Sequence, residues 1–183
     1  MSNNKDINVY VDGSAKIDTK QFGIGWVKAD SKDRFKSQKS KRLSVHNACS
    51  TAAEVYAAQD ALDHVRKNSH IIIHSDSMAV VEAINKDTFY DKIRHSTKNK
   101  PLRRAWQALK LAIQKHTDVR AEFTRENEHP FMQQAHDNAK SGSYLKFNEN
   151  LCNNSGYNRK KQKPIDIDLD QSEEDLFEGH LEI

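Results

Sequence analysis

Four acidic residues lie at positions where they could form a catalytic or metal-binding group: Asp12, Glu54, Asp76 and Asp137. Asp12 and Asp76 each end an apolar run, and Glu54 and Asp137 lie in segments with helical spacing. If they converge, their negative charges repel each other unless cations are present. Two Mg²⁺ ions, which prefer oxygen ligands, would resolve that repulsion. At a separation of about 4 Å they would also support phosphodiester hydrolysis, one activating water and the other stabilising the leaving oxygen.

Each acid also has an explanation that involves no chemistry. Asp76, or either serine beside it, could cap a following helix. Asp12 precedes a glycine, which is typical of a turn. Glu54 stands three residues after Thr51, the spacing of a capping box. Asp137 could be an ordinary exposed helix residue, so the surrounding elements have to decide.

The chain reads as three strands followed by alternating helices and strands. Strands are expected at 7–15, 22–29, 34–45, 70–76 and 118–124, and helices at 50–68, 77–85, 101–116 and about 131–142. The first strand is expected to break into a turn at Asp12-Gly13, and residues 86–100 to be basic and irregular. Three consecutive strands favour an antiparallel meander. We therefore predict an α/β fold with a mixed five-stranded sheet flanked by helices.

This arrangement would bring the acids together. If strands 7–15 and 70–76 are parallel neighbours, Asp12 and Asp76 emerge side by side at one end of the sheet, where active sites of open α/β sheets lie. Helix 50–68 would carry Glu54 at the border of an apolar stripe, pointing towards the sheet. That stripe consists of Ala58, Ala61, Leu62 and Val65.

Four motifs resemble those of the type 1 ribonuclease H family: "VYVDGSA", "STAAEVYAAQDAL", "IIIHSDSMAVVEAI" and "AHDNA". The resemblance covers about residues 6–142. It implies a ribonuclease H-like fold that cleaves the RNA strand of RNA–DNA hybrids with two Mg²⁺ ions, for which Mn²⁺ may substitute, leaving 3′-hydroxyl and 5′-phosphate ends. On this reading Asp12, Glu54, Asp76 and Asp137 are the metal ligands, and Asp76 is buried among apolar neighbours to fix a metal.

Many members of this family carry an auxiliary histidine on a loop about ten residues before the last aspartate. Here Asn127 stands ten residues before Asp137, and His129 stands eight before it. The wording "RENE" resembles a branch with glutamate on this loop, which makes Glu126 the auxiliary candidate and His129 the alternative. A loop histidine is more often a surface residue, and His136 is interpreted as incidental.

Substrate contacts are expected at the start of helix 50–68 and just after Asp76. The resemblance implies that Asn47, Ser50 and Thr51 bind phosphate backbones, and a helix N-terminus suits this role. Met78 would lie by the minor groove. The alternatives are that Ser50 and Thr51 only cap the helix and that Met78 packs in the core.

A basic segment resembles the hybrid-binding protrusion of some family members. Basic side chains beside aromatic ones suit a phosphate backbone with stacking, although a charge run is usually a solvated face and Trp106 fits the core. The residues concerned are Lys92, Arg94, His95, Lys98, Lys100, Arg103 and Arg104, with Phe89, Tyr90 and Trp106 interleaved.

Charge is divided sharply along the chain. Residues 164–183 hold eight of the 26 acidic residues and no Lys or Arg, so residues 1–163 hold 29 basic against 18 acidic residues, a charge of +11. A basic body favours a polyanionic partner. We predict a ribonuclease H domain at 1–145 and a flexible, basic-then-acidic tail at 146–183. The tail could solvate the protein, fold back on the basic face, or bind a protein partner through "EEDLF".

Composition narrows the class of protein further. No run approaches the ~18 apolar residues of a membrane span, and the first residues do not follow a secretory signal. Cys49 and Cys152 form no disulfide framework or zinc motif. We expect a cytoplasmic monomer with no membrane association. The alternatives to a ribonuclease are a non-catalytic nucleic-acid-binding module and a DNA-directed nuclease on the same fold.

Overall fold

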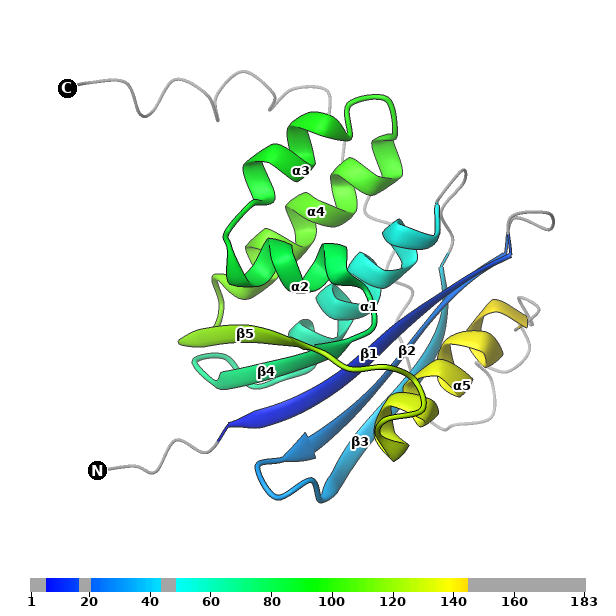
Figure 1. The fold of residues 1–183 in the computed structure, drawn as a ribbon, viewed down its shortest axis with the longest axis vertical. Coiled ribbons are helices and arrows are strands. Elements are labelled where there is room, and N and C mark those ends of the chain that lie inside the picture. The colour runs from blue at the N-terminus through cyan, green and yellow to red at the C-terminus, as the bar shows by residue number, and fades with distance from the viewer. Residues whose placement is uncertain (1–5, 17–20, 44–48, 145–183) are drawn as a thin grey trace, which may run out of the picture. The chain divides into compact units, whose positions relative to one another are not determined.

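The computed structural model describes residues 6–16, 21–43 and 49–144. The strands are β1 (Ile7–Lys16), β2 (Gln21–Asp30), β3 (Phe35–Leu43), β4 (His70–Ser75) and β5 (Asp118–Phe123). The helices are α1 (Ser50–Asp63), α2 (Met78–Asn85), α3 (Phe89–His95), α4 (Lys100–Ile113) and α5 (Pro130–Tyr144) (Figure 1). Asn47 and the predicted tail lie outside the described residues, so the predicted domain boundary stays a prediction.

The five strands form one mixed sheet in the order β3-β2-β1-β4-β5. The pairs β1–β2 and β2–β3 are antiparallel, and the pairs β1–β4 and β4–β5 are parallel. This confirms the predicted meander followed by parallel strands. The parallel register of β1 and β4 runs from Ile7 opposite Ile71 to Tyr10 opposite His74. The two strands therefore end their pairing just before Asp12 and Asp76.

Helices cover both faces of the sheet. Helix α5 lies against β1, β2 and β3 on one face, and α1 to α4 lie on the other (Figure 1). Gly25 of β2 allows the close approach of α5, because a Cβ atom there would lie 2.2 Å from the carbonyl oxygen of Ala135. Asp12 is the register partner of Gly25. Directly opposed residues share a face of the sheet, so Asp12 faces α5.

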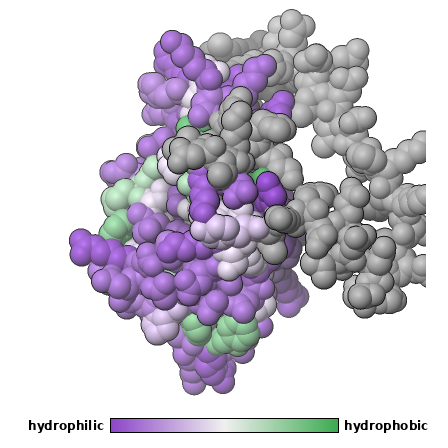
Figure 2. Space-filling model, turned by 90° about the vertical axis from the view of Figure 1, so that its right-hand side faces the viewer, coloured by the Kyte–Doolittle hydropathy of each residue, from purple (hydrophilic) through white to green (hydrophobic). Residues whose placement is uncertain are grey.

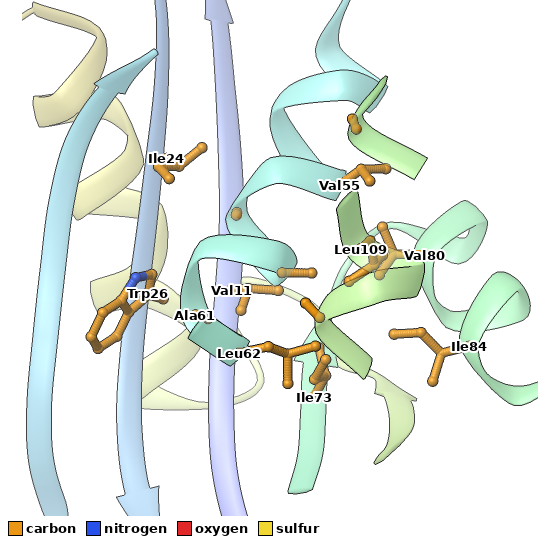
Figure 3. Packing of buried hydrophobic residues seen from close by; sticks show 14 of the residues in the cluster. Val11, Ile24, Trp26, Val55, Ala61, Leu62, Ile73, Val80, Ile84 and Leu109 are labelled. Carbon is orange, nitrogen blue, oxygen red and sulfur yellow. The ribbon is translucent and has the colours of Figure 1, made fainter. Parts of the chain in front are cut away.

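The main core lies between the sheet and helices α1, α2 and α4 (Figure 3). Alternate β1 residues Val9 and Val11 point into it, as period-two patterning requires. Ala58, Ala61 and Leu62 of α1 are buried, which confirms the predicted stripe as far as the helix extends, and Val65, two residues after the helix ends, is buried too. A smaller cluster on the other face packs under α5 and consists of Tyr10, Val27, Ala29, Met132 and Ala135.

Three local predictions were wrong. The first strand does not break at Asp12 but continues to Lys16, because β2 goes on pairing with it after β4 has left. Helix α1 ends at Asp63 rather than near residue 68. The segment 86–100 is not irregular: it contains α3, which buries Phe89 against Trp106 at a ring-centroid distance of 6.2 Å.

The face shown in Figure 2 is mostly hydrophilic, with hydrophobic residues in small, separate patches. In the part of the chain that the structure describes, no helix has the length and apolar character that crossing a bilayer would require.

Substituting Gly25→Ala should destabilise the protein by about 1 to 3 kcal/mol, because the added methyl group would overlap the backbone of α5. Chemical denaturation measures the change. Ser141→Ala, at an exposed position of the same helix, is the control and should have little effect. Equal stability of the two variants would contradict the packing described for α5.

Candidate metal centre

Three of the four predicted carboxylates meet at the carboxyl end of the parallel strands. One oxygen from each of Asp12, Glu54 and Asp76 lies within 4.8 Å of the other two. Asp12 comes from the middle of β1, Glu54 is the fifth residue of α1, and Asp76 is the residue after β4. Within the described ranges, no second group of His, Cys, Asp or Glu side chains is arranged in this way.

The position of Glu54 depends on a glycine. A Cβ atom on Gly13 would lie 2.3 Å from the backbone nitrogen of Glu54, so only glycine lets α1 approach β1 this closely. The Gly13 N–H then donates a hydrogen bond of 2.9 Å to Glu54 Oε2. The capping-box alternative is wrong, because the N-cap of α1 is Cys49 and makes no side-chain capping bond. Glu54 is therefore aimed at β1 rather than at its own helix.

Asp76 is also free of a capping role. The N-cap of α2 is Ser77, which makes no side-chain capping bond, while the Ser77 N–H donates to Ser75 Oγ at 3.1 Å. The expectation that Asp76 is buried was wrong: Asp76 is exposed, whereas Asp12 is only 3% exposed. The buried residue at the end of β4 is Ser75. The group of three carboxylates is therefore buried at Asp12 and open to solvent at Asp76.

The pKa values of all three carboxyl groups are raised, mainly by burial. Burial, with the charge of Asp76 added, raises the pKa of Asp12 to about 6. Burial and the charges of Asp12 and Asp76 raise the pKa of Glu54 well above its usual range. Partial burial also raises the pKa of Asp76. All three shifts have the same sign, because negative charge is poorly accommodated at this place.

Asp60 shows what a buried acid with a structural role looks like in the same protein. Its carboxylate accepts hydrogen bonds from Trp26 Nε1 at 2.9 Å and from the Nζ atoms of Lys39 and Lys41 at 3.0 Å each. Burial raises the pKa of Asp60, but these partners outweigh that effect and the pKa is lowered overall. Asp12, Glu54 and Asp76 lack such ammonium partners among the described residues, so a bound cation would be needed to neutralise their charge.

Helix α5 adds a histidine to the site. His136 Nδ1 lies 3.1 Å from Asp12 Oδ2, and His136 Nε2 lies 3.1 Å from Glu126 Oε1. His136 therefore links Glu126 to the buried carboxylate, and its interpretation as incidental was wrong. The spacing of residues 133, 136 and 137 places them on one face of a helix, which indicates that His136 lies on the same side of the helix as Asp137.

The fourth predicted ligand, Asp137, lies outside the group of three. It is exposed on α5, and its Oδ1 atom accepts a hydrogen bond of 3.4 Å from Gln133 Nε2. The same Gln133 Nε2 donates to Glu126 Oε1 at 3.1 Å. A side chain from an exposed helix face can stay in solvent, which avoids adding a fourth negative charge to the group.

The two auxiliary candidates are placed differently. Glu126 contacts His136, and His136 in turn contacts Asp12. His129 instead stacks on Tyr10, with ring centroids 4.4 Å apart, and lies 3.8 Å from Asp33. The geometry thus favours Glu126 over His129 as the residue near the carboxylates.

The predicted substrate-binding residues lie around this site with mixed outcomes. Ser50 is exposed and Thr51 half-buried in the first turn of α1. Neither is the N-cap, so the capping alternative does not hold for them. Met78 is 50% exposed at the start of α2, so the core-packing alternative is wrong.

The basic segment forms α3 and the start of α4. Arg94, Lys98 and Lys100 are exposed and Lys92 is half-buried. Of the three aromatic residues in this region, only Tyr90 is exposed, at 63%, whereas Phe89 and Trp106 belong to the core. The segment is therefore a basic surface with one available aromatic ring.

The residues present fit a divalent metal. The oxygens of three carboxylates lie within 4.8 Å of one another and provide the hard donor set that Mg²⁺, Mn²⁺ and Ca²⁺ prefer. Their raised pKa values mark a local excess of negative charge that a cation would relieve. Asp12, Glu54 and Asp76 could therefore hold a metal ion.

Comparison with models of protein families shows to which family this chain belongs. A family model described as RNase H matches residues 4–127 of the 183, about two thirds of the chain. The chain belongs to the RNase H family. The match contains Asp12, Glu54 and Asp76 and ends before α5. The RNase H family is metal-dependent, and membership supports ribonuclease activity. A comparison with curated proteins found no match.

Solved structures share the fold. RNase H1 from the archaeon Halobacterium salinarum is 17% identical with a TM-score of 0.58, covering 75% of this chain and 96% of that one. LC11-RNase H1 from compost, in complex with an RNA/DNA hybrid, is 16% identical with a TM-score of 0.54, covering 74% and 97%. The protease–reverse transcriptase of prototype foamy virus is 23% identical with a TM-score of 0.55, covering 80% of this chain and 22% of that one. These matches confirm the predicted ribonuclease H-like fold.

Asp12→Asn should stabilise the metal-free protein at pH 7 by about 1 to 3 kcal/mol. The pKa of Asp12 is raised to about 6 in the folded state, so keeping Asp12 ionised at pH 7 lowers the free energy of unfolding, and the neutral Asn removes that loss. The folded pKa lies above the unfolded one, so the stability from this group is present below about pH 4 and is lost as the pH rises through 6. Thermal denaturation at pH 4 and pH 7 measures both effects. Asp12→Asn that destabilises the metal-free protein at pH 7 would contradict the repulsion.

Proposed function

We propose that this protein is an endoribonuclease that hydrolyses the RNA strand of RNA–DNA hybrids, leaving 3′-hydroxyl and 5′-phosphate ends. The single observation that carries the proposal is the convergence of Asp12, Glu54 and Asp76 within 4.8 Å at the end of the parallel strands. A chain of the RNase H family that had become a binding module only would not need to keep three mutually repelling carboxylates, which cost stability.

In this proposal Asp12, Glu54, Asp76 and Asp137 hold two Mg²⁺ ions, for which Mn²⁺ can substitute. Such ions make water a better nucleophile and stabilise the charge that develops on the phosphate. The protein's own part is positional. Gly13 fixes the Glu54 carboxylate through its N–H, and burial holds Asp12 in place. Asp137, which is exposed beside the site, would turn towards the cations once they neutralise the other three acids.

Glu126 is proposed as the auxiliary acid on the loop before α5. It lies 3.1 Å from His136, which itself lies 3.1 Å from Asp12, so it stands next to the carboxylates without being one of the three that meet. A carboxylate at that distance can take up and release a proton near the reacting phosphate or draw the product away. The exposed fraction of its side chain, 40%, leaves it open to solvent for that exchange.

The substrate would lie across the first turn of α1 and the basic helices. Asn47, Ser50 and Thr51 are proposed to bind phosphates, aided by the backbone N–H groups at the start of α1. Met78, half exposed two residues after Asp76, would contact the minor groove, where 2′-hydroxyls distinguish RNA from DNA. Electrostatic contacts would come from α3, the start of α4 and the segment between them, through Lys92, Arg94, Lys98 and Lys100.

The direct test is a cleavage assay on a hybrid with a labelled RNA strand. The wild-type protein should cut the RNA in Mg²⁺, and Asp12→Asn or Asp76→Asn should lower the rate at least about 100-fold, because a metal ligand contributes more than the 10- to 100-fold of its hydrogen-bond partners. Asp118→Asn, an exposed acid on β5, is the matched control and should cut normally.

The same assay separates the alternatives. Binding of the hybrid without cleavage in either Mg²⁺ or Mn²⁺ would favour a binding module and overturn the proposal. Equal cleavage of a matched DNA–DNA duplex would indicate a DNA-directed nuclease. Sequencing of the cut ends tests the proposed 3′-hydroxyl and 5′-phosphate.

Metal affinity should distinguish the roles of Asp137 and Glu126. Asp137→Asn should weaken Mn²⁺ binding about 10- to 100-fold if Asp137 completes the ligand set. Glu126→Gln should leave the affinity nearly unchanged and slow cleavage instead. Titration calorimetry of both variants measures this. Unchanged affinity in Asp137→Asn would remove Asp137 from the ligand set.

A further inference from the structure

The loop between β5 and α5, residues 124–129, carries Glu126 to the site. Its start is tied to the sheet, because the Thr124 N–H donates to the Ser75 carbonyl at 3.0 Å. A turn closes its middle, where the Glu128 N–H donates to the Arg125 carbonyl at 3.0 Å and the Arg125 N–H donates to Glu128 Oε2 at 2.9 Å. These bonds shape the loop, but those of the turn lie within the loop and do not fix it to the site.

The end of the loop is fixed by the start of α5, where the Met132 and Gln133 N–H groups donate to the His129 carbonyl at 3.0 and 3.1 Å, and by an aromatic stack. The ring of His129 lies parallel to the ring of Tyr10, with centroids 4.4 Å apart and an angle of 10° between the planes. On its other face Tyr10 stacks in the same way on His74 of β4, at 4.4 Å and 12°. Tyr10 is itself 2% exposed and donates a hydrogen bond of 2.9 Å to Asp33. His129 therefore docks on a ring that the sheet holds rigidly.

One backbone and two side-chain contacts set the orientation of the His129 ring. The Phe131 N–H donates to His129 Nδ1 at 3.2 Å, so the neutral ring carries its proton on Nε2. That nitrogen lies 3.3 Å from the Tyr10 hydroxyl oxygen and 3.8 Å from Asp33 Oδ2. The ring is thus held at its face by Tyr10 and at its edges by Phe131 and Asp33.

The contacts of Glu126 itself are weaker than this stack. Its carboxylate meets His136 and Gln133 at 3.1 Å each, but its side chain is 40% exposed. Exposed ion pairs of this kind contribute at most about 1 kcal/mol. The neighbouring Arg125, Asn127 and Glu128 are exposed and do not pack in either core cluster. Segments with so few buried contacts open locally, unless something at their end restrains them.

We propose that His129 is a positioning residue for Glu126. By stacking on Tyr10 it restrains the 124–129 loop and keeps the Glu126 carboxylate beside His136 and Asp12. The role in turnover rests on the proposed function, because it assumes that Glu126 takes part in the reaction. The restraint on the loop does not, because it is a property of the metal-free protein.

The restraint is tested by amide hydrogen exchange of the full, metal-free chain. His129→Ala should speed exchange at residues 125–128 about three- to tenfold, which corresponds to losing one aromatic pair. His129→Phe keeps a flat ring on Tyr10 and should stay close to wild type. His95→Ala, an exposed histidine on α3, is the control. Wild-type exchange in His129→Ala would overturn the proposal, whatever the catalytic result.

A double-mutant cycle tests whether His129 acts through Glu126. In hybrid cleavage, His129→Ala should lower kcat with little change in KM, and the His129→Ala/Glu126→Ala double variant should be no slower than Glu126→Ala alone. Multiplied losses in the double variant would overturn the positioning role. If the wild-type chain cuts no hybrid, the proposed function fails, while the exchange experiment still decides whether His129 restrains the loop.

Discussion

Electrostatic repulsion among Asp12, Glu54 and Asp76 is the constraint around which this molecule is built. The oxygens of these carboxylates lie within 4.8 Å of one another. Burial, with the charges of the neighbouring carboxylates added, raises the pKa values of Asp12 and Glu54 and costs the fold stability. The protein contains a direct comparison in Asp60, which is buried but surrounded by Trp26, Lys39 and Lys41 and has a lowered pKa. One acid is satisfied by the chain itself. The other three have no ammonium partner among the described residues and could hold a metal ion.

The fold maintains this unfavourable arrangement through backbone geometry. The parallel pairing of β1 and β4 stops just before Asp12 and Asp76, so both acids leave the sheet at one place. Gly13 admits α1 so closely that Glu54 is held by a backbone N–H. The core on both faces of the sheet fixes these elements, and its burial supplies the stability that the acidic group takes away.

The sequence was sufficient for the features that follow from periodicity and order. The alternation in β1, the isoleucines of β4 and the stripe on α1 predicted the sheet and brought Asp12, Glu54 and Asp76 together. Helix α3 could not be predicted, because seven residues rarely form a helix alone and its stability comes from burying Phe89 on Trp106. The link from Glu126 to His136 depends on how a loop folds back over α5, and the roles of His129 and Asp137 depend on the same loop and helix face.

The most direct measurement of the central claim is the pKa of the Asp12 carboxyl group, followed by carbon NMR with and without Mg²⁺. Without metal the pKa should be near 6, well above that of an ordinary aspartate, because the group is buried next to Asp76. Saturating Mg²⁺ should bring it back below the ordinary value, since a cation favours the ionised form. An ordinary pKa that Mg²⁺ leaves unchanged would show that these carboxylates neither repel one another nor hold a metal.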